Sequence, residues 1–160
     1  MIVSFQRTPI GRIGIAESGG AITNLCFEHY PVPDGAEPGD SELLREAFRQ
    51  LQAYLQGNLR VFDLPLDPQG TPFMREVWRH VAAVPYGRTA SYRDVALAAG
   101  NPKAVRAVGM ANRRNPLPVF IPCHRIIGSD GKLTGYRGGL PLKQRLLDLE
   151  RCRQDTPAGL

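Results

Sequence analysis

Three residues able to take part in nucleophilic chemistry stand together in the segment Pro122-Cys123-His124-Arg125, directly after an apolar run. A cysteine thiol becomes a useful nucleophile when a nearby base or positive charge lowers its pKa, and His124 and Arg125 are candidates for these two effects. Most cysteines are instead small buried apolar residues, so a Cys-His dipeptide alone does not distinguish a catalytic thiol from an inert one. Cys123 is therefore a candidate nucleophile that needs support from other motifs.

The remaining cysteines give no sign of a disulfide framework or of a complete metal site. The chain has three cysteines, an odd number at irregular spacing, which indicates reduced thiols. Cys26 and His29 have the spacing of half a zinc site, and His80 is a further candidate ligand, but a tetrahedral site needs four ligands. Glycine-rich nucleotide-binding motifs are also missing from the sequence. We therefore expect no metal and no cofactor.

The elements that position Cys123 are predicted to be mainly helical. Thr71 is expected to cap one helix, and Ser91 begins a short helix with a capping-box pattern. A second short helix follows a turn at Asn101, so this pair has a helix-turn-helix pattern. We expect the apolar run that ends at Cys123 to have strand character and a closing helix to extend over residues 141–150.

The second helix of that pair carries positive charge and little bulk. Its basic residues are Lys103, Arg106, Arg113 and Arg114. Its small residues are Ala104, Ala107, Gly109 and Ala111. Small residues would let the helix approach a nucleic-acid groove closely, but they are equally expected where two helices pack together, so both interpretations stay open.

The first half of the chain is predicted to form a separate domain. Alternating polar and apolar residues indicate a small antiparallel sheet with strands in residues 2–5, 12–16 and 21–27. After a cap at Asp40 or Ser41, helical periodicity continues to Gly57, and this helix is expected to cover the sheet. Residues 58–70 are typical of a linker. We therefore expect two domains, residues 1–69 and residues 70–160.

Charge is distributed unevenly between these halves. The 160 residues include 20 Lys and Arg and 15 Asp and Glu, but residues 1–70 hold only five of the basic residues and nine of the acidic ones. The basic second half suits a polyanionic partner, although a modestly basic surface can also serve solubility alone. The N-terminal residues resemble no signal peptide, and no stretch is long and apolar enough to cross a membrane. We expect a cytoplasmic protein that does not contact membranes.

Longer motifs around Cys123 resemble those of a known family. They are Arg106-Ala-Val-Gly, Asn115-Pro, Ile121-Pro-Cys-His-Arg-Ile-Ile-Gly, Leu133-Thr-Gly-Tyr-Arg-Gly-Gly-Leu and Leu146-Leu-Asp-Leu-Glu. This series resembles the active-site signature of the O6-alkylguanine-DNA alkyltransferases, also called methylated-DNA-protein-cysteine methyltransferases. The similarity covers nearly all of residues 70–150, whereas the first half is similar mainly in its layout.

The resemblance implies an α+β fold and direct-reversal DNA repair. The first domain would be RNase H-like, and the second would be mostly helical, with a winged-helix-like helix-turn-helix and an active-site turn. Cys123 would take an alkyl group from O6 of guanine in double-stranded DNA, irreversibly and once per molecule, with the protein binding the minor groove as a monomer. The preferred alkyl group, repair of O4-alkylthymine and cooperative DNA binding stay open.

The resemblance also implies catalytic roles for residues near Cys123. His124 would take the thiol proton through a water molecule, and Glu150 would orient His124. Judged by itself, Glu150 would more simply be a solvated carboxylate at a helix end. Asn115 would tie the recognition helix to the active-site turn.

Other residues are implied to handle the damaged nucleotide, which must leave the base stack to be reached. Arg106 would fill the gap, although by itself it would more simply bind a phosphate, and Tyr92 would hold the flipped nucleotide. The residues implied for the substrate pocket are Pro122, Ile126, Tyr136 and Arg137. Many relatives have a small residue in place of Arg137, so a long cation there is expected to narrow or recharge the pocket.

Two other functions fit parts of the sequence. A non-catalytic lesion sensor would flip alkylguanine and pass the damage to another pathway, but sensors of this kind lack the cysteine that Cys123 supplies. A transcriptional regulator would need a dimerising or effector segment. Related regulators have several cysteines in a fused metal-binding domain, whereas here only Cys26 precedes the predicted linker.

Overall fold

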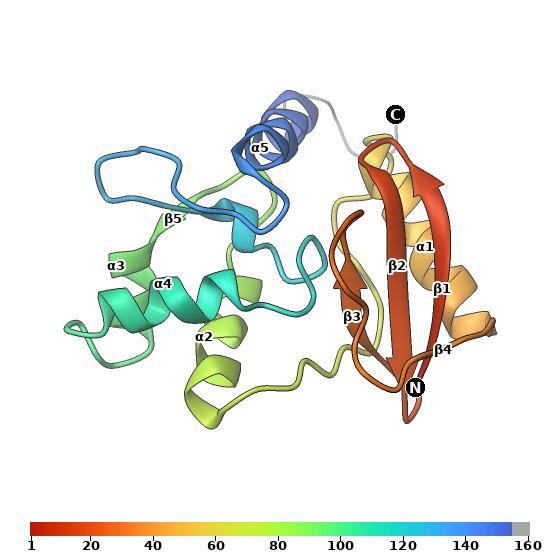
Figure 1. Cartoon of the computed structure of the whole chain (residues 1–160). Coiled ribbons are helices and arrows are strands. Elements are labelled where there is room, and N and C mark those ends of the chain that lie inside the picture. The colour runs from red at the N-terminus through yellow and green to blue at the C-terminus, as the bar shows by residue number, and fades with distance from the viewer. Residues whose placement is uncertain (155–160) are drawn as a thin grey trace. The chain divides into compact units, whose positions relative to one another are not determined.

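The computed structural model describes residues 1–154, which form two compact units. One unit contains residues 1–69 and the other begins at residue 70 (Figure 1). Residues 155–160, which complete the second predicted domain, lie outside the described residues. No helix within residues 1–154 is long and apolar enough to cross a membrane.

A four-stranded sheet forms the first unit. Its strands are β1 (Ile2–Thr8), β2 (Gly11–Ser18), β3 (Ala21–Cys26) and β4 (Glu37–Pro38), in the order β3-β2-β1-β4. The first three are antiparallel as predicted, but β4 pairs in parallel with β1, so the sheet is mixed. Two residues within a proline-rich loop show no alternation of polar and apolar side chains, and the sequence therefore gave no sign of β4.

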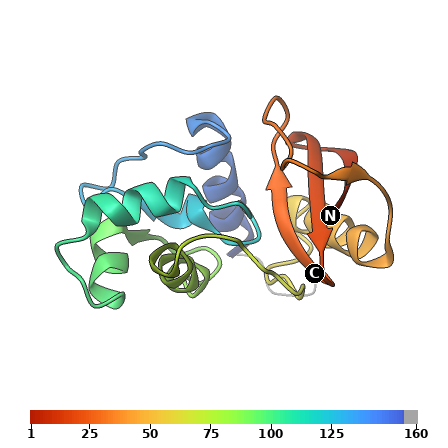
Figure 2. The same cartoon turned by 60° about the horizontal axis from the view of Figure 1, so that its bottom comes forward.

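Helix α1 (Glu42–Leu55) covers one face of this sheet, as Figures 1 and 2 show. Ser41 caps the helix, because its Oγ accepts a hydrogen bond from the Leu44 amide at 3.1 Å.

The segment predicted as a linker is partly bound to this unit. The Gln50 side chain bonds both backbone groups of Asp63, and residues 65–67 pair with Ile22 at the sheet edge. The fold of the first unit therefore extends into the predicted linker.

Residues 70–154 contain four α-helices and the segment that carries Cys123. The helices are α2 (Pro72–Ala82), α3 (Tyr92–Ala98), α4 (Val105–Arg113) and α5 (Leu140–Gln154). Thr71 caps α2, and Ser91 caps α3 in a capping box with Asp94, as predicted. Helix α4 begins later than expected, so Lys103 lies in the turn before it.

The small residues of α4 serve packing on one side and leave space on another. Ala111 is buried, and its carbonyl oxygen accepts a 2.7 Å hydrogen bond from the indole N–H of the buried Trp78 in α2. Ala107, by contrast, is exposed. The packing interpretation is therefore confirmed for Ala111, whereas the approach to a nucleic-acid groove stays a prediction for the exposed part of the helix.

The apolar run before Cys123 does not form the predicted strand. The Ile121 amide bonds the Leu117 carbonyl at 2.8 Å, and Val119 has φ of 75°. Cys123 then begins the 3-10 helix η1 (Cys123–Arg125), which leads into β6 (Ile126–Ile127), paired in parallel with β5 (Ala90–Ser91). A short buried apolar run gives the same pattern in a strand and in a compact turn, and this explains the wrong prediction.

Candidate active site

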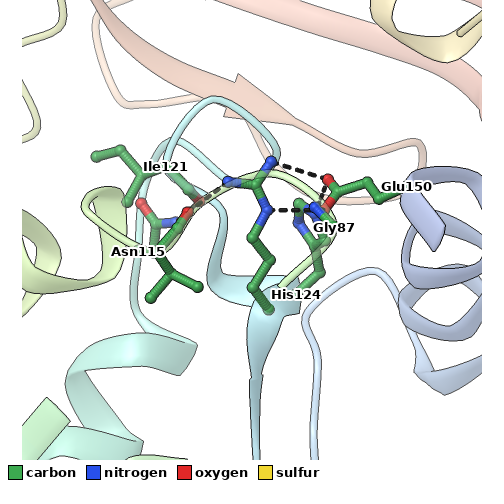
Figure 3. A network of polar contacts seen from close by, with 7 residues as sticks. Gly87, Asn115, Ile121, His124 and Glu150 are labelled. Carbon is green, nitrogen blue, oxygen red and sulfur yellow. Dashed lines mark hydrogen bonds and ion pairs between the residues drawn. The ribbon is translucent and has the colours of Figure 1, made fainter. Parts of the chain in front are cut away.

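Glu150 lies at the centre of a buried polar network that joins α5 to η1 (Figure 3). Its Oε2 is 2.7 Å from Nε2 of His124, and Arg125 donates to both carboxylate oxygens, from Nε at 2.7 Å and from Nη2 at 3.0 Å. The Gly87 amide donates a fourth, longer bond of 3.3 Å. Glu150 is 1% exposed and lies inside α5, which continues to Gln154. The interpretation of Glu150 as a solvated helix-end carboxylate is therefore wrong.

This network sets the charge states of His124 and Glu150. Burial opposes ionisation of Glu150, but hydrogen bonds from His124 and Arg125 outweigh burial and lower the pKa of the carboxyl to about 2. Burial lowers the pKa of His124, against the opposing effect of Glu150. The resting pair is therefore a carboxylate beside a neutral imidazole. Because Glu150 accepts from Nε2, the neutral ring keeps its basic lone pair on Nδ1.

The Arg125 guanidinium binds the Glu150 carboxylate rather than acting on the Cys123 thiol. Besides its two bonds to the carboxylate, the guanidinium donates from Nη1 to the Val84 carbonyl at 2.7 Å. The charges that act to lower the pKa of Cys123 come from Lys143 and Arg137. The expectation that Arg125 supplies charge to the thiol is therefore wrong, and its function is to compensate a buried carboxylate.

Cys123 is held as a protonated thiol. It is 4% exposed, and burial raises its pKa to about 11, against the opposing effects of Asn115, Lys143 and Arg137. This contradicts the expected lowering of the thiol pKa. Since the thiolate is the reactive species, the arrangement requires a base, and the neutral His124 is the adjacent residue.

Asn115 connects the end of α4 to the turn that carries Cys123. Its side-chain amide donates to the Ile121 carbonyl at 2.9 Å, and its Oδ1 accepts from the Leu117 amide at 2.9 Å. Between these two bonds lies Val119, in the left-handed region that β-branched residues avoid. The buried Asn115 therefore stabilises a strained turn two residues before the thiol.

Two residues near the Cys123 thiol, Lys143 and Asn112, were not predicted as site residues from the sequence. Lys143 of α5 is 0% exposed and donates to the carbonyls of Ile126, at 2.6 Å, and Thr134, at 3.0 Å. Burial lowers the pKa of its ammonium group to about 8. Asn112 of α4 donates to the Cys123 carbonyl at 3.3 Å. Lys143 lies seven residues before Glu150 and so shares its helix face, and this spacing was the available signal.

Tyr92 and Arg106, the residues predicted to handle the flipped nucleotide, line the same hollow of about 320 Å³. Arg106 is exposed on α4, and Tyr92 is the first residue of α3. The Tyr92 hydroxyl is 2.7 Å from Oγ1 of Thr134, in the loop between β6 and α5. The structure thus brings Tyr92 and Arg106 together beside the loop that leads to α5.

Two of the four predicted pocket residues flank η1, and the other two lie in the loop before α5. Pro122 precedes η1 and Ile126 follows it, and both are buried. Tyr136 is buried and Arg137 half-buried in the loop before α5. A 2.9 Å hydrogen bond from the Gly139 amide to the Tyr136 carbonyl closes the turn that contains Arg137.

The candidate zinc ligands belong to different units of the chain. Cys26 and His29 belong to the first unit, whereas His80 belongs to α2 and contacts Glu76 of the same helix at 3.0 Å. Among residues 1–154, no group of three or more His, Cys, Asp and Glu side chains is placed to hold a metal ion.

The free energy of unfolding is expected to fall as the pH is lowered from about 7 to about 4. Folding lowers the pKa of His124 below its ordinary 6.5 and that of Glu150 from 4.5 to about 2. Such groups bind protons more readily in the unfolded chain, so their contribution is fully present above the unfolded pKa and is lost as the pH falls. The loss should begin with His124 and continue with Glu150. Urea unfolding at stepped pH measures it, and a constant stability down to about pH 5 would contradict a buried neutral His124.

Comparisons with known proteins assign both halves of the chain to one family. A model of the 6-O-methylguanine DNA methyltransferase ribonuclease-like domain matches residues 1–68, and a model of the DNA binding domain of the same methyltransferase matches residues 72–152. The chain therefore belongs to the methylated-DNA–protein-cysteine methyltransferase family.

Individual relatives are similar over almost their whole length. The methylated-DNA–protein-cysteine methyltransferase of Methanosarcina barkeri is 47% identical, with 94% of this chain and 97% of the relative aligned. The constitutive enzyme of that name from Bacillus subtilis is 46% identical over 90% of this chain and 92% of its own. The crystal structure of Mycobacterium tuberculosis OGT in complex with DNA superposes with a TM-score of 0.90 at 42% identity, covering 96% of this chain and 94% of that one. The fold is therefore that of the α+β family members, as predicted.

Proposed function

We propose that this protein repairs alkylated DNA by direct reversal, moving the alkyl group from O6 of guanine to Cys123. The observation that carries this proposal is the buried arrangement of Cys123, His124 and Glu150, in which His124 bonds Glu150 at 2.7 Å. The relatives named methylated-DNA–protein-cysteine methyltransferase support the reaction class. Their similarity extends over both units of the chain.

Recognition of the lesion is assigned to the helix-turn-helix. The M. tuberculosis relative was solved in complex with DNA, which supports DNA as the partner. Helix α4 would enter the minor groove, where exposed Arg106 would occupy the space left by the flipped nucleotide. Tyr92 would hold that nucleotide beside the hollow that both residues line. One cytoplasmic molecule acting as a monomer suffices for this scheme.

The chemistry begins with proton removal from the thiol. Nδ1 of His124, directly or through a water molecule, would take this proton, and Glu150 would stabilise the resulting imidazolium. The thiolate sulfur then attacks the carbon attached to O6, and the carbon–oxygen bond breaks with its electron pair passing to guanine. The proton ends on guanine and the protein keeps a thioether. A thioether is not readily cleaved, so each molecule acts once.

The lesion-sensor alternative is not favoured. A sensor needs a lesion pocket but no nucleophile, whereas this chain keeps Cys123 together with its buried histidine and carboxylate. A buried ion pair and a strained turn impose a cost on folding that lesion binding alone does not require. These features are consistent with a chemical role.

Mass spectrometry of the intact protein tests the proposal. After incubation with a duplex containing one O6-methylguanine, the protein should gain one methylene, about 14 Da, mapped to the peptide with Cys123, as expected of an activated thiol nucleophile. The same duplex with unmodified guanine is the control and should leave the mass unchanged. Binding of the methylated duplex without any mass gain would replace the repair proposal with the sensor function.

A further inference from the structure

Thr134, in the loop between β6 and α5, contacts residues from two other elements. Its hydroxyl oxygen is 2.7 Å from the hydroxyl oxygen of Tyr92, the first residue of α3. Its carbonyl oxygen accepts a 3.0 Å hydrogen bond from the ammonium group of Lys143 in α5. The same ammonium group donates at 2.6 Å to the carbonyl of Ile126, which directly follows the 3-10 helix that begins at Cys123. A continuous series of hydrogen bonds therefore connects Tyr92, through Thr134 and Lys143, to the catalytic turn.

Two further contacts hold Tyr92 and this loop in place. The ammonium nitrogen of Lys143 lies 5.9 Å from the centre of the Tyr92 ring, within the range of a cation–π attraction. Arg113 of α4 packs so closely on Gly135 that a Cβ atom at this position would collide with its guanidinium group. The loop that carries Thr134 is therefore contacted by side chains from α3, α4 and α5.

The Thr134 hydroxyl lies where bound DNA would cover it. Thr134 lines the same hollow of about 320 Å³ as Tyr92 and Arg106. Thr134 is exposed in the free protein, so water competes with its hydrogen bond to Tyr92. A nucleotide lying in the hollow would displace that water, and a hydrogen bond is stronger where water is excluded. The bond between the two hydroxyl groups should therefore contribute most when DNA is bound.

We propose that Thr134 is a positioning residue that orients the Tyr92 hydroxyl toward the flipped nucleotide. This inference rests on the proposed function, in which Tyr92 holds that nucleotide. With Thr134 donating to the tyrosine oxygen, the O–H of Tyr92 donates to an acceptor on the nucleotide, and hydrogen bonds in series strengthen one another. Because the Thr134 carbonyl is bonded to Lys143, the same residue keeps the held nucleotide in a fixed position relative to the turn that carries Cys123.

Transfer from two substrates tests whether Thr134 acts through the nucleotide. A duplex with one O6-methylguanine must be flipped and held, whereas the free base O6-methylguanine needs neither step. Chromatography of the guanine product gives the ratio of the duplex rate to the free-base rate. Thr134→Val keeps the shape of the side chain without the hydroxyl and should lower this ratio about tenfold, as expected for one hydrogen bond. Thr134→Ser keeps the hydroxyl and should retain the ratio of the original protein.

A double substitution gives a second test on the duplex alone. In Tyr92→Phe the Thr134 hydroxyl has no tyrosine hydroxyl to orient, so adding Thr134→Val should change the duplex rate by less than about twofold. A further tenfold loss would show that Thr134 acts independently of Tyr92 and would overturn the inference. A ratio of duplex to free-base rate that is unaffected by Thr134→Val would also overturn it, while leaving the proposed function intact. Absence of transfer to Cys123 in the original protein from either substrate would overturn the proposed function itself.

Discussion

Replacing Cys123 with serine should abolish alkyl transfer while the protein still folds and binds DNA. A serine hydroxyl is a much weaker nucleophile than a thiolate, and His124 is too weak a base to ionise it fully. The transfer rate should fall on the order of 10⁶-fold, the loss seen when the nucleophile of a hydrolytic triad is removed. Quantification of restored guanine in a duplex with one O6-methylguanine measures this change.

Cys152→Ser is the matched control for this substitution. Cys152 lies in α5, like Glu150, but is exposed, so its replacement should leave the transfer rate and the stoichiometry unchanged. Transfer by Cys123→Ser at a rate near that of the original protein would show that another nucleophile accepts the alkyl group. Loss of transfer in Cys152→Ser would point to the same conclusion.

Replacing Glu150 with glutamine should destabilise the protein and slow transfer together. The substitution leaves the Arg125 guanidinium buried without its carboxylate, and it turns one of the two acceptor oxygens into an amide donor that faces the N–H groups of Arg125 or His124. Breaking a buried pair in this way costs about 3 to 5 kcal/mol. Urea unfolding gives the free energy, and transfer assayed under conditions where the variant is folded gives the catalytic effect.

Glu76→Gln is a chemically matched control because Glu76 also contacts one arginine and one histidine, Arg79 and His80. These contacts lie at the surface of α2, where ion pairs contribute little to stability. Glu76→Gln should therefore change the unfolding free energy and the transfer rate only slightly. Equal effects of the two substitutions would contradict the special role assigned to the buried network.

Local signals in the sequence were sufficient to predict most elements. Ser41, Thr71 and Ser91 begin helices because their hydroxyls bond backbone amides three residues later, a pattern that depends on only four residues. The turn before Cys123 was wrongly predicted because its conformation depends on Asn115, whose side chain bonds two other parts of the segment. Periodicity contains no information on such bonds.

The sequence predicted which residues form the site better than it predicted their pKa shifts and charge pairing. The motifs identified Cys123, His124 and Glu150, but the direction of the thiol pKa depends on burial, and burial of one residue is not visible in a dipeptide. The pairing of Arg125 with Glu150 likewise could not be predicted, because it depends on where α5 packs against η1. Lys143 was detectable, since a lysine in register with Leu146, Leu147 and Glu150 lies on the buried helix face.

The raised pKa of Cys123 also affects how long an unused molecule survives. Peroxides and adventitious electrophiles react with thiolates much faster than with thiols. With a pKa of about 11 in the resting protein, only about one molecule in 10⁴ carries the thiolate at neutral pH. A protein that reacts once cannot recover from an accidental reaction. Burial of the protonated thiol therefore preserves the repair capacity of the protein between lesions.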